Sequence, residues 1–391
     1  MSTMNDSEIL QKALGGLQRC VGQTPDAGSY VFTTLNLLSQ EGPSNGVVTD
    51  TGETVTQPKV QDISSITKFT ELRQVRLSGQ AISDLSPIVS LPFLAELQAD
   101  HNTLNMSIEN CAAKWCKEQE EGKAWRDGDR SIGSILEVVN LSHNQIIGPL
   151  GDHSKHRFLR SLDLSHNNIQ TLGAGLFMLY NLKHLNISNN GINIIESNDL
   201  PTCLTSLDVS SNGLDNIKFI DNLLSLEKIV LDSNRVGVLN ALSSCSLLRI
   251  CSAKNNVLRD FDCIRVLQDN EHLQELHILG NPICAVEFVR LRVIAILQQL
   301  RTLDNDVVDA TDKVKSEVLT GSEHEKRKER WNKMIGTEFT DMVKAFKFSE
   351  RQDEENIEEA IRSSAENAVN TAINQATPRV DTAGEFATRP R

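Results

Sequence analysis

Aromatic residues are scarce in this sequence, at 4% of 391 positions, with 2 tyrosines and 3 tryptophans. No run of eighteen apolar residues occurs, so we expect no membrane-spanning helix. The opening residues MSTMNDSEIL lack the basic-then-apolar layout of a secretory signal. The 8 cysteines are scattered, without the spacing of a disulfide framework. We therefore expect a cytoplasmic protein with reduced thiols and no membrane association.

Sequence motifs for chemistry are missing as well. No phosphate-binding loop, G-x-S-x-G elbow or HExxH motif occurs. Cys111 and Cys116 lack the second pair that a zinc site requires. The formal net charge of −13 argues against a nucleic-acid binder, because such proteins neutralise phosphates with cations. We expect no enzyme activity, no cofactor, no metal and no nucleic-acid partner.

An apolar frame ending on asparagine recurs through the middle of the chain. From Leu159 the frame is L-x-x-L-x-L-x-x-N-x-I, with its asparagine at Asn167. The other copies end on Asn102, Asn144, Asn190, Asn212, Asn234, Asn256 and Asn281, and a weaker first copy ends on Gln80. The interval is 22 to 25 residues, apart from a step of 42 residues between Asn102 and Asn144. This pattern is that of a leucine-rich-repeat array.

The frame predicts how each repeat folds. Each repeat is a short strand and a return segment, which can bury its apolar face only by stacking on a neighbour. Alternate strand residues point inward, and the asparagine amide both donates to and accepts from the backbone, so we assign the asparagines a structural role. A period near 22 residues favours 3₁₀ or irregular return turns over full helices. The predicted fold class is α/β: a solenoid with a curved parallel sheet on its concave side.

The flanking composition divides the chain into four parts. Residues 1–60 form an expected N-terminal cap, with an amphipathic helix over 7–21, a strand from Tyr30 to Leu38 and a linker over 40–58. Residues 61–284 are the array, and 285–310 are an expected C-terminal cap that includes a helix. Residues 311–391 are an expected extended, charged helical tail.

The 42-residue step implies an insertion of about 20 residues, by comparison with the regular repeat, at 105–134. It carries Trp115, Trp125 and the charged run KEQEE over 117–121. Solenoid insertions leave from one face and often contact partners. A solvated loop with a short amphipathic helix is the alternative, and the sequence leaves both open.

Two surfaces are predicted to bind proteins. On the concave face, the exposed positions between core residues supply Arg76, Gln98, Asp100, His143, Asp163, His166, His184, Asp208, Lys228, Asp232 and Lys254. In the tail, an aromatic and aliphatic cluster supplies Trp331, Met334, Phe339, Phe346 and Phe348. This cluster either folds back on the array or docks on a partner.

Histidines raise the question of a metal site. His143, His166 and His184 recur at repeat spacing, so neighbouring strands could bring the first two within about 5 Å. No thiolate or carboxylate joins them at tight spacing, and His153 and His156 offer no better set. We therefore favour a structural or surface role for all five.

Family resemblances give the array a biological setting. The closing segment, with Arg290, Leu297, Leu300, Leu303 and Asp304, resembles the C-terminal cap of phosphatase-regulator-type leucine-rich repeats; Val289 and Gln298 replace the Tyr and Pro of that cap. Residues 82–102 resemble the leucine-rich-repeat protein of ciliary radial spokes.

The radial-spoke resemblance implies a structural component of the axoneme of motile cilia and flagella, in the cytoplasm and cytoskeleton. Its partners would be other radial-spoke or axonemal proteins in a hetero-complex rather than a homo-oligomer. The alternative is a cytosolic protein phosphatase regulatory subunit that binds its enzyme on the concave face. A nuclear ribonucleoprotein scaffold is a third possibility, disfavoured by the acidic balance.

Overall fold

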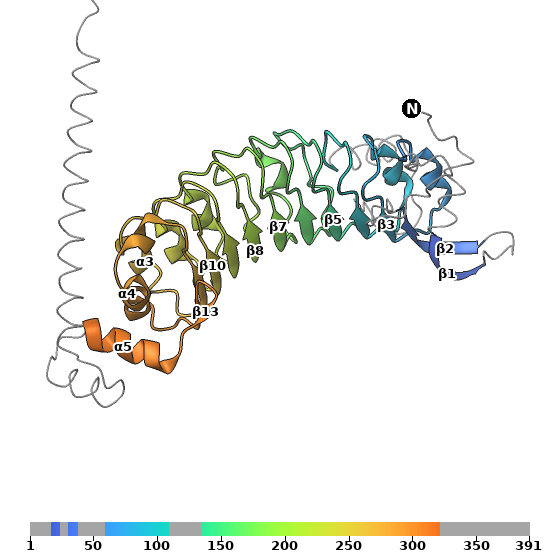
Figure 1. Cartoon of the computed structure of the whole chain (residues 1–391). Coiled ribbons are helices and arrows are strands. Elements are labelled where there is room, and N and C mark those ends of the chain that lie inside the picture. The colour runs from blue at the N-terminus through green and yellow to red at the C-terminus, as the bar shows by residue number, and fades with distance from the viewer. Residues whose placement is uncertain (1–16, 24–29, 38–58, 109–133, 321–391) are drawn as a thin grey trace, which may run out of the picture.

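The computed structural model describes residues 17–23, 30–37, 59–108 and 134–320. Within these ranges one 13-stranded sheet runs in chain order along the inner side of an arch (Figure 1). Its central strands are β3 (Gln74–Arg76), β4 (Glu96–Gln98), β5 (Val138–Asn140), β6 (Ser161–Asp163), β7 (His184–Asn186), β8 (Ser206–Asp208), β9 (Lys228–Val230), β10 (Ile250–Ser252) and β11 (Glu275–His277). Each pairs in parallel with the next. The predicted solenoid with a parallel sheet is confirmed.

Strand register explains why the apolar frame produces a core. The middle residue of each strand pairs with the middle residue of the next, as Leu162 does with Leu185 and Leu207 with Ile229. These middle residues are buried, while their neighbours on the strand, apart from the buried Ser252 of β10, are partly or fully exposed. Because strand side chains alternate between faces, every repeat adds one such residue to a continuous core.

The return segments are mostly short 3₁₀ turns, as the period predicts. They are η1 (Ser64–Lys68), η2 (Ser86–Ser90), η3 (Ala174–Leu176), η4 (Lys218–Asn222), η5 (Asn240–Ser244) and η6 (Pro282–Ala285). The α-helix α3 (Asp262–Arg265) lies in the longest of the regular repeats, between Asn256 and Asn281. Among the helices in the described ranges, none is long and apolar enough to span a membrane.

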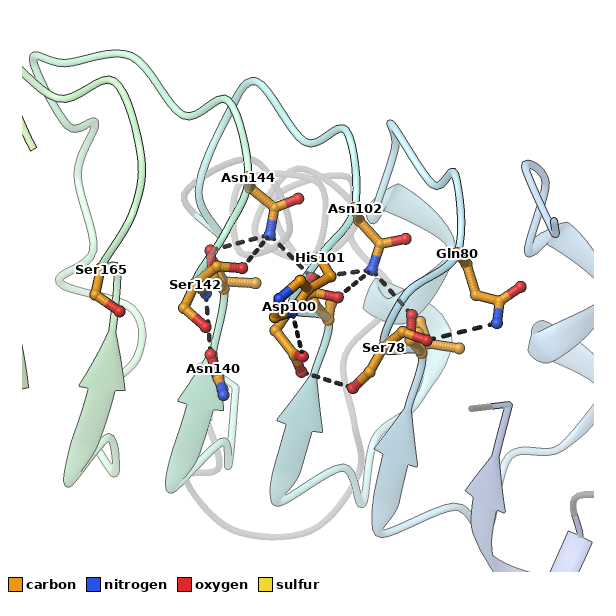
Figure 2. A network of polar contacts seen from close by, with 12 residues as sticks. Ser78, Gln80, Asp100, His101, Asn102, Asn140, Ser142, Asn144 and Ser165 are labelled. Atoms are coloured by element: carbon orange, nitrogen blue, oxygen red, sulfur yellow. Dashed lines mark hydrogen bonds and ion pairs between the residues drawn. The ribbon is translucent and has the colours of Figure 1, made fainter. Parts of the chain in front are cut away.

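The asparagines form a ladder of buried or partly buried hydrogen bonds (Figure 2). Asn102 Nδ2 donates to the carbonyls of Leu77 (2.9 Å) and Ala99 (3.0 Å), while its Oδ1 accepts the Ile82 N–H at 3.1 Å. Gln80 does the same in the first repeat: Nε2 donates to Leu37 O at 2.8 Å and Oε1 accepts the Val60 N–H at 3.0 Å. The expected structural role of these amides is confirmed, since each satisfies backbone groups of two repeats.

The residue ahead of each ladder amide adopts a left-handed backbone conformation. The nine such residues have φ between 52° and 78°: Gly79, His101, His143, His166, Asn189, Ser211, Ser233, Asn255 and Gly280. This region is sterically costly for bulky or β-branched side chains, and histidine and asparagine tolerate it better than most. The turn directs the chain off the strand and sets this side chain at the rim of the concave face.

At the N-terminal end a strand replaces part of the expected helix. β1 (Leu17–Gln23) pairs antiparallel with β2 (Tyr30–Asn36), which pairs in parallel with β3. The predicted strand that begins at Tyr30 is confirmed. The prediction of a helix over 7–21 is wrong for residues 17–21, which belong to β1. Without β1, the edge of β2 would have a row of backbone N–H and C=O groups without partners. Because β1 satisfies these groups, strand pairing outweighs the helical periodicity of residues 17–21. Residues 7–16 and the linker over 40–58 lie outside the described residues.

The C-terminal end is closed by a helix and a small hairpin. Helix α4 (Val289–Ile296) is followed by β12 (Thr302–Leu303) and β13 (Asp306–Val307), an antiparallel pair that the sequence pattern did not predict. Asp304, directly after β12, contacts the last repeat: its Oδ1 accepts the N–H groups of Ile278 (2.7 Å) and Leu279 (3.0 Å). The last repeat is thereby covered.

Helix α5 (Ala310–Thr320) packs on this cap rather than leaving it. Arg290 donates to the carboxylate of Asp312 at 2.8 Å, and Val318 and Leu319 are buried. The segment expected as tail from 311 thus begins in contact with α4. The remainder, including Trp331, Met334, Phe339, Phe346 and Phe348, lies outside the described residues.

The long step between Asn102 and Asn144 contributes a single repeat to the ladder, because β4 pairs directly with β5. Ser107 and Ile108 are buried, so the first residues of the expected insertion over 105–134 belong to the array's core. The reason is that Ile108 supplies an apolar side chain and a carbonyl to the return segment of the next repeat. Residues 109–133, with both tryptophans and the charged run, lie outside the described residues.

Candidate protein-binding surface

All eleven residues predicted for the concave face are partly or fully exposed. Six stand on the strands: Arg76, Gln98, Asp163, His184, Asp208 and Lys228. Asp100, Asp232 and Lys254 follow their strands by two positions, and His143 and His166 stand in the left-handed turns. The sheet therefore gathers residues from repeats far apart in sequence on one continuous polar surface.

Hydrogen bonds hold the carboxylates of this surface in place. Asp163 accepts the Ser165 N–H at 2.9 Å and the Asn186 amide at 3.1 Å. Asp232 bridges to the next repeat, accepting from the Ser252 hydroxyl at 2.6 Å and the Lys254 N–H at 2.8 Å. Side chains fixed in this way lose little conformational entropy on binding, which suits a recognition surface.

Three imidazoles stack along the rim. The ring centroids of His101 and His143 are 4.1 Å apart with an interplanar angle of 17°, and those of His143 and His166 are 4.0 Å apart at 10°. The expected closeness of His143 and His166 is confirmed. His184 stands on β7 instead, and His101, which the sequence analysis left out of the set, takes its place in the stack. The shared position ahead of the ladder asparagine could have revealed this.

The stack has the wrong geometry for a metal chelate. Parallel rings present their in-plane nitrogen lone pairs side by side, whereas a chelate requires them to converge. Over the described ranges no group of three or more His, Cys, Asp or Glu side chains could hold a metal ion. Burial, followed by the neighbouring His166 and His101, lowers the pKa of His143.

Asp100 anchors the N-terminal end of the stack (Figure 2). Its Oδ2 is 3.0 Å from His101 Nδ1, and its Oδ1 accepts the Ser78 hydroxyl at 2.6 Å. The carboxylate therefore links two repeats and orients the first imidazole.

His153 and His156 belong to the core. Both are 0% exposed, with His153 Nε2 3.1 Å from the Ser107 hydroxyl and His156 Nε2 donating to Ile108 O at 3.1 Å. Burial lowers the pKa of His156 to about 4. These side chains hold the backbone that enters the 109–133 segment against the next repeat.

Two cysteines of the core have unreactive thiols. Cys251 and Cys263 are buried, and burial raises the pKa of each thiol to about 12. Thiolates are the reactive form of cysteine, so these two behave as small apolar side chains.

The strand ladder, the asparagine ladder and the repeating frame make this chain a leucine-rich-repeat protein. A family profile described as "Leucine rich repeat" matches residues 157–214. Leucine-rich repeat-containing protein 23 of Bos taurus is 24% identical over 260 residues, which is 66% of this chain and 69% of that protein. Tsukushi of Xenopus tropicalis is 49% identical over 53 residues, which is 13% of this chain and 15% of that protein.

Among solved structures, the functional domain of InlJ from Listeria monocytogenes is similar to this chain. The two are 20% identical with a TM-score of 0.47, over 66% of this chain and 54% of the other. The alignments with Tsukushi and InlJ thus span less than two thirds of those proteins.

Proposed function

We propose that this protein is a non-catalytic scaffold that binds other proteins along its concave face. The observation that carries the proposal is the pre-organised polar surface, in which Asp163, Asp208 and Asp232 are fixed by hydrogen bonds within and between repeats. Rigid concave solenoid surfaces of this kind suit extended protein contacts. The eleven concave residues named above are the proposed contact residues.

Charge reversal on the concave face tests this proposal. The double substitution Asp163→Lys and Asp208→Lys is expected to weaken binding of partners that crosslinking and mass spectrometry identify on native material. The matched control is Glu196→Lys with Asp215→Lys, at two exposed residues of the return segments. Equal binding by the two variants, both folded, would exclude the concave face as the contact surface.

The proposed setting is the axoneme of motile cilia and flagella, where the protein would link radial-spoke components. The resemblance of residues 82–102 to the leucine-rich-repeat protein of radial spokes supports this setting. In the structure this segment forms β4, the return turn η2 and the Asn102 ladder position. The tail residues Trp331, Met334, Phe339, Phe346 and Phe348 would attach a second component.

Fractionation decides the setting. A tagged protein expressed in motile ciliated cells is expected to stay with detergent-extracted axonemes. Recovery only from the cytosol or nucleus would exclude the axonemal role while leaving the scaffold proposal intact.

A phosphatase regulatory subunit is the alternative. The cap favours it: Arg290 donates to Leu303 O at 3.4 Å and to Asp312 at 2.8 Å, and Asp304 accepts the Ile278 N–H at 2.7 Å, so the residues shared with phosphatase-regulator-type repeats do form a cap. Co-elution of the purified protein with a serine/threonine phosphatase catalytic subunit would support this function. Separate elution would count against it.

A further inference from the structure

A second surface lies along the edge of the sheet where the strands begin, in the turns just ahead of each strand; we call it the strand-start edge. Large apolar side chains are exposed there in several repeats. Phe158 is 49% exposed ahead of β6, and Tyr180 is 63% exposed ahead of β7. Leu224 and Leu247 are 59% and 45% exposed ahead of β9 and β10. These residues come in two pairs from adjacent repeats, β6 with β7 and β9 with β10, and apolar patches of this kind mark interaction sites.

The edge is cationic around Phe158 and Tyr180. Arg157, Arg160 and Lys183 are all exposed, and the turn that carries Tyr180 has no carboxylate between residues 174 and 184. The Asn181 amide donates to Arg157 O at 2.7 Å, which ties the two aromatic turns together. Glu137 offsets one charge weakly, at 3.8 Å from Arg160. The chain has a net charge of −13, so this local positive charge is opposite in sign to that of the whole protein. The edge therefore suits an acidic ligand with apolar side chains.

Helix α5 reaches this same edge. Lys313 Nζ donates to Gln298 O at 2.6 Å. Gln298 stands four residues ahead of β12, as Tyr180 stands four residues ahead of β7. The chain therefore runs toward Thr320 from the strand-start edge of the last repeat.

The chain beyond Thr320 contains a segment of matching chemistry. Residues 349–361 read SERQDEENIEEAI, with six carboxylates, one arginine and two isoleucines, Ile357 and Ile361. Between Thr320 and Ser349 the chain spans about 44 Å even at a helical rise of about 1.5 Å per residue. From β12 back to β6 the sheet spans about 29 Å at about 4.8 Å per strand. The segment can therefore reach the aromatic rings without unfolding any repeat.

We propose that residues 349–361 bind in cis to the strand-start edge. Their carboxylates pair with Arg157, Arg160 and Lys183, and their isoleucines cover Phe158 and Tyr180. The exposed ion pairs are individually weak, so binding depends on several pairs acting with the apolar contacts. High salt, at which the Debye length is about 3 Å, loosens the segment.

Zero-length carbodiimide crosslinking of the full-length protein tests the proposal. The reagent joins amines to carboxylates in direct contact, so mass spectrometry is expected to find Lys183 joined to a carboxylate within 350–359. Crosslinking an equal mixture of ¹⁴N-labelled and ¹⁵N-labelled protein distinguishes contacts within one chain from contacts between two copies, because only the latter join ¹⁴N to ¹⁵N peptides. Arg157→Glu with Arg160→Glu keeps Lys183 as the reporter and is expected to lower the crosslink yield about fivefold or more.

Two further variants sharpen this test. Glu354→Lys and Glu355→Lys are then added to the double arginine variant. This is expected to restore a crosslink, now between the amines introduced in the tail and the carboxylates introduced at the edge. Arg259→Glu with Arg265→Glu reverses two exposed arginines elsewhere, at the same net charge change, and is expected to leave the yield unchanged. Phe158→Ser with Tyr180→Ser is expected to lower the yield while Lys183 stays in place.

Three outcomes overturn the proposal. The first is the absence of a Lys183 crosslink to this segment. The second is a crosslink yield that both arginine reversals lower equally. The third is a crosslink found only between ¹⁴N and ¹⁵N chains, which would place the segment on a second copy.

Discussion

The imidazole rings of His143 and His166 lie 4.0 Å apart and within 10° of parallel, one repeat behind the other. Both residues have φ of 53°, the left-handed conformation that every repeat adopts ahead of its ladder amide. The backbone therefore places these side chains in line, and the histidines stack because the sequence has the same residue at the same turn. A structural requirement of the fold thus creates a feature of the surface.

The stack predicts an altered titration of its middle ring. In the unmodified protein His143 should titrate below its ordinary pKa of 6.5, because of burial and its two histidine neighbours. His166→Asn keeps a residue that tolerates positive φ and should raise the pKa of His143 toward 6.5. NMR titration of the imidazole carbon-bound protons measures this shift. His184→Asn, on β7, should leave it unchanged; an equal rise in both variants would contradict the argument.

The asparagine ladder predicts a large loss of stability when one of its amides is replaced by a carboxylate. Asn167 Nδ2 donates to the carbonyls of Leu141, Leu164 and Ser165 at 3.0 to 3.1 Å. Asn167→Asp removes these donors and aims a carboxylate at the carbonyls. We expect the free energy of unfolding to fall by roughly 3 kcal/mol or more, measured by urea denaturation.

The adjacent residue provides the control for the ladder. Asn168 is exposed, so Asn168→Asp makes the same chemical change outside the ladder. It should alter the free energy of unfolding by no more than about 0.5 kcal/mol. Similar costs at both positions would show that the buried amide network is not the cause.

The buried His156 predicts a loss of stability in acid. Its pKa is about 4 in the folded protein against an ordinary value of 6.5, so between these values the unfolded chain binds the proton and the folded chain does not. Stability from this residue is complete above pH 6.5 and declines as the pH falls toward 4. The decline should total roughly 3 kcal/mol, since one pKa unit corresponds to about 1.4 kcal/mol.

Urea denaturation at pH 7 and pH 4.5 measures the acid effect. His156→Leu should lower stability at pH 7, where the bond to Ile108 O is lost, and should make the remaining pH dependence shallower. His184→Asn, at an exposed position, should keep the full pH dependence. An unchanged slope in His156→Leu would show that other groups cause the acid loss.

The inward face of the sheet predicts which residues tolerate a charge. Leu207, in β8, is 0% exposed, while its neighbour Ser206 is partly exposed. Leu207→Asp buries an unpaired carboxylate and should cost roughly 3–5 kcal/mol, unfolding the adjacent repeats. Ser206→Asp should leave the melting curve nearly unchanged. The reverse order in circular dichroism melts would overturn the assignment of inward and outward faces.

The tail predicts a separation of folding from attachment. Deleting residues 331–348 removes Trp331, Met334, Phe339, Phe346 and Phe348. The array should keep its melting temperature, because every repeat from β3 to β11 is covered by its neighbours or by the caps, while partner attachment should weaken. A deleted protein that aggregates or melts lower would show that this cluster packs on the array.

The repeat frame alone predicts the solenoid, because its period and its asparagine encode local geometry. Every strand from β3 to β11 falls on the frame, and Gln80 also occupies a ladder position, since its longer amide can supply the same hydrogen bonds. The concave surface follows from strand alternation. Periodicity failed at β1, where helical spacing over 7–21 gave no sign of the open edge of β2 that residues 17–23 cover.

Other features depend on pairings between distant residues. Ser107 and Ile108 became part of the core because His153 and His156, more than forty residues later, contact them. The cationic strand-start edge arose because the pairing of β6 with β7 brings the turn of Phe158 next to the turn of Tyr180, and Arg157, Arg160 and Lys183 with them. A sequence pattern records the period of a repeat. The stacking of repeats decides which side chains meet across that period, and those contacts exist only in the folded chain.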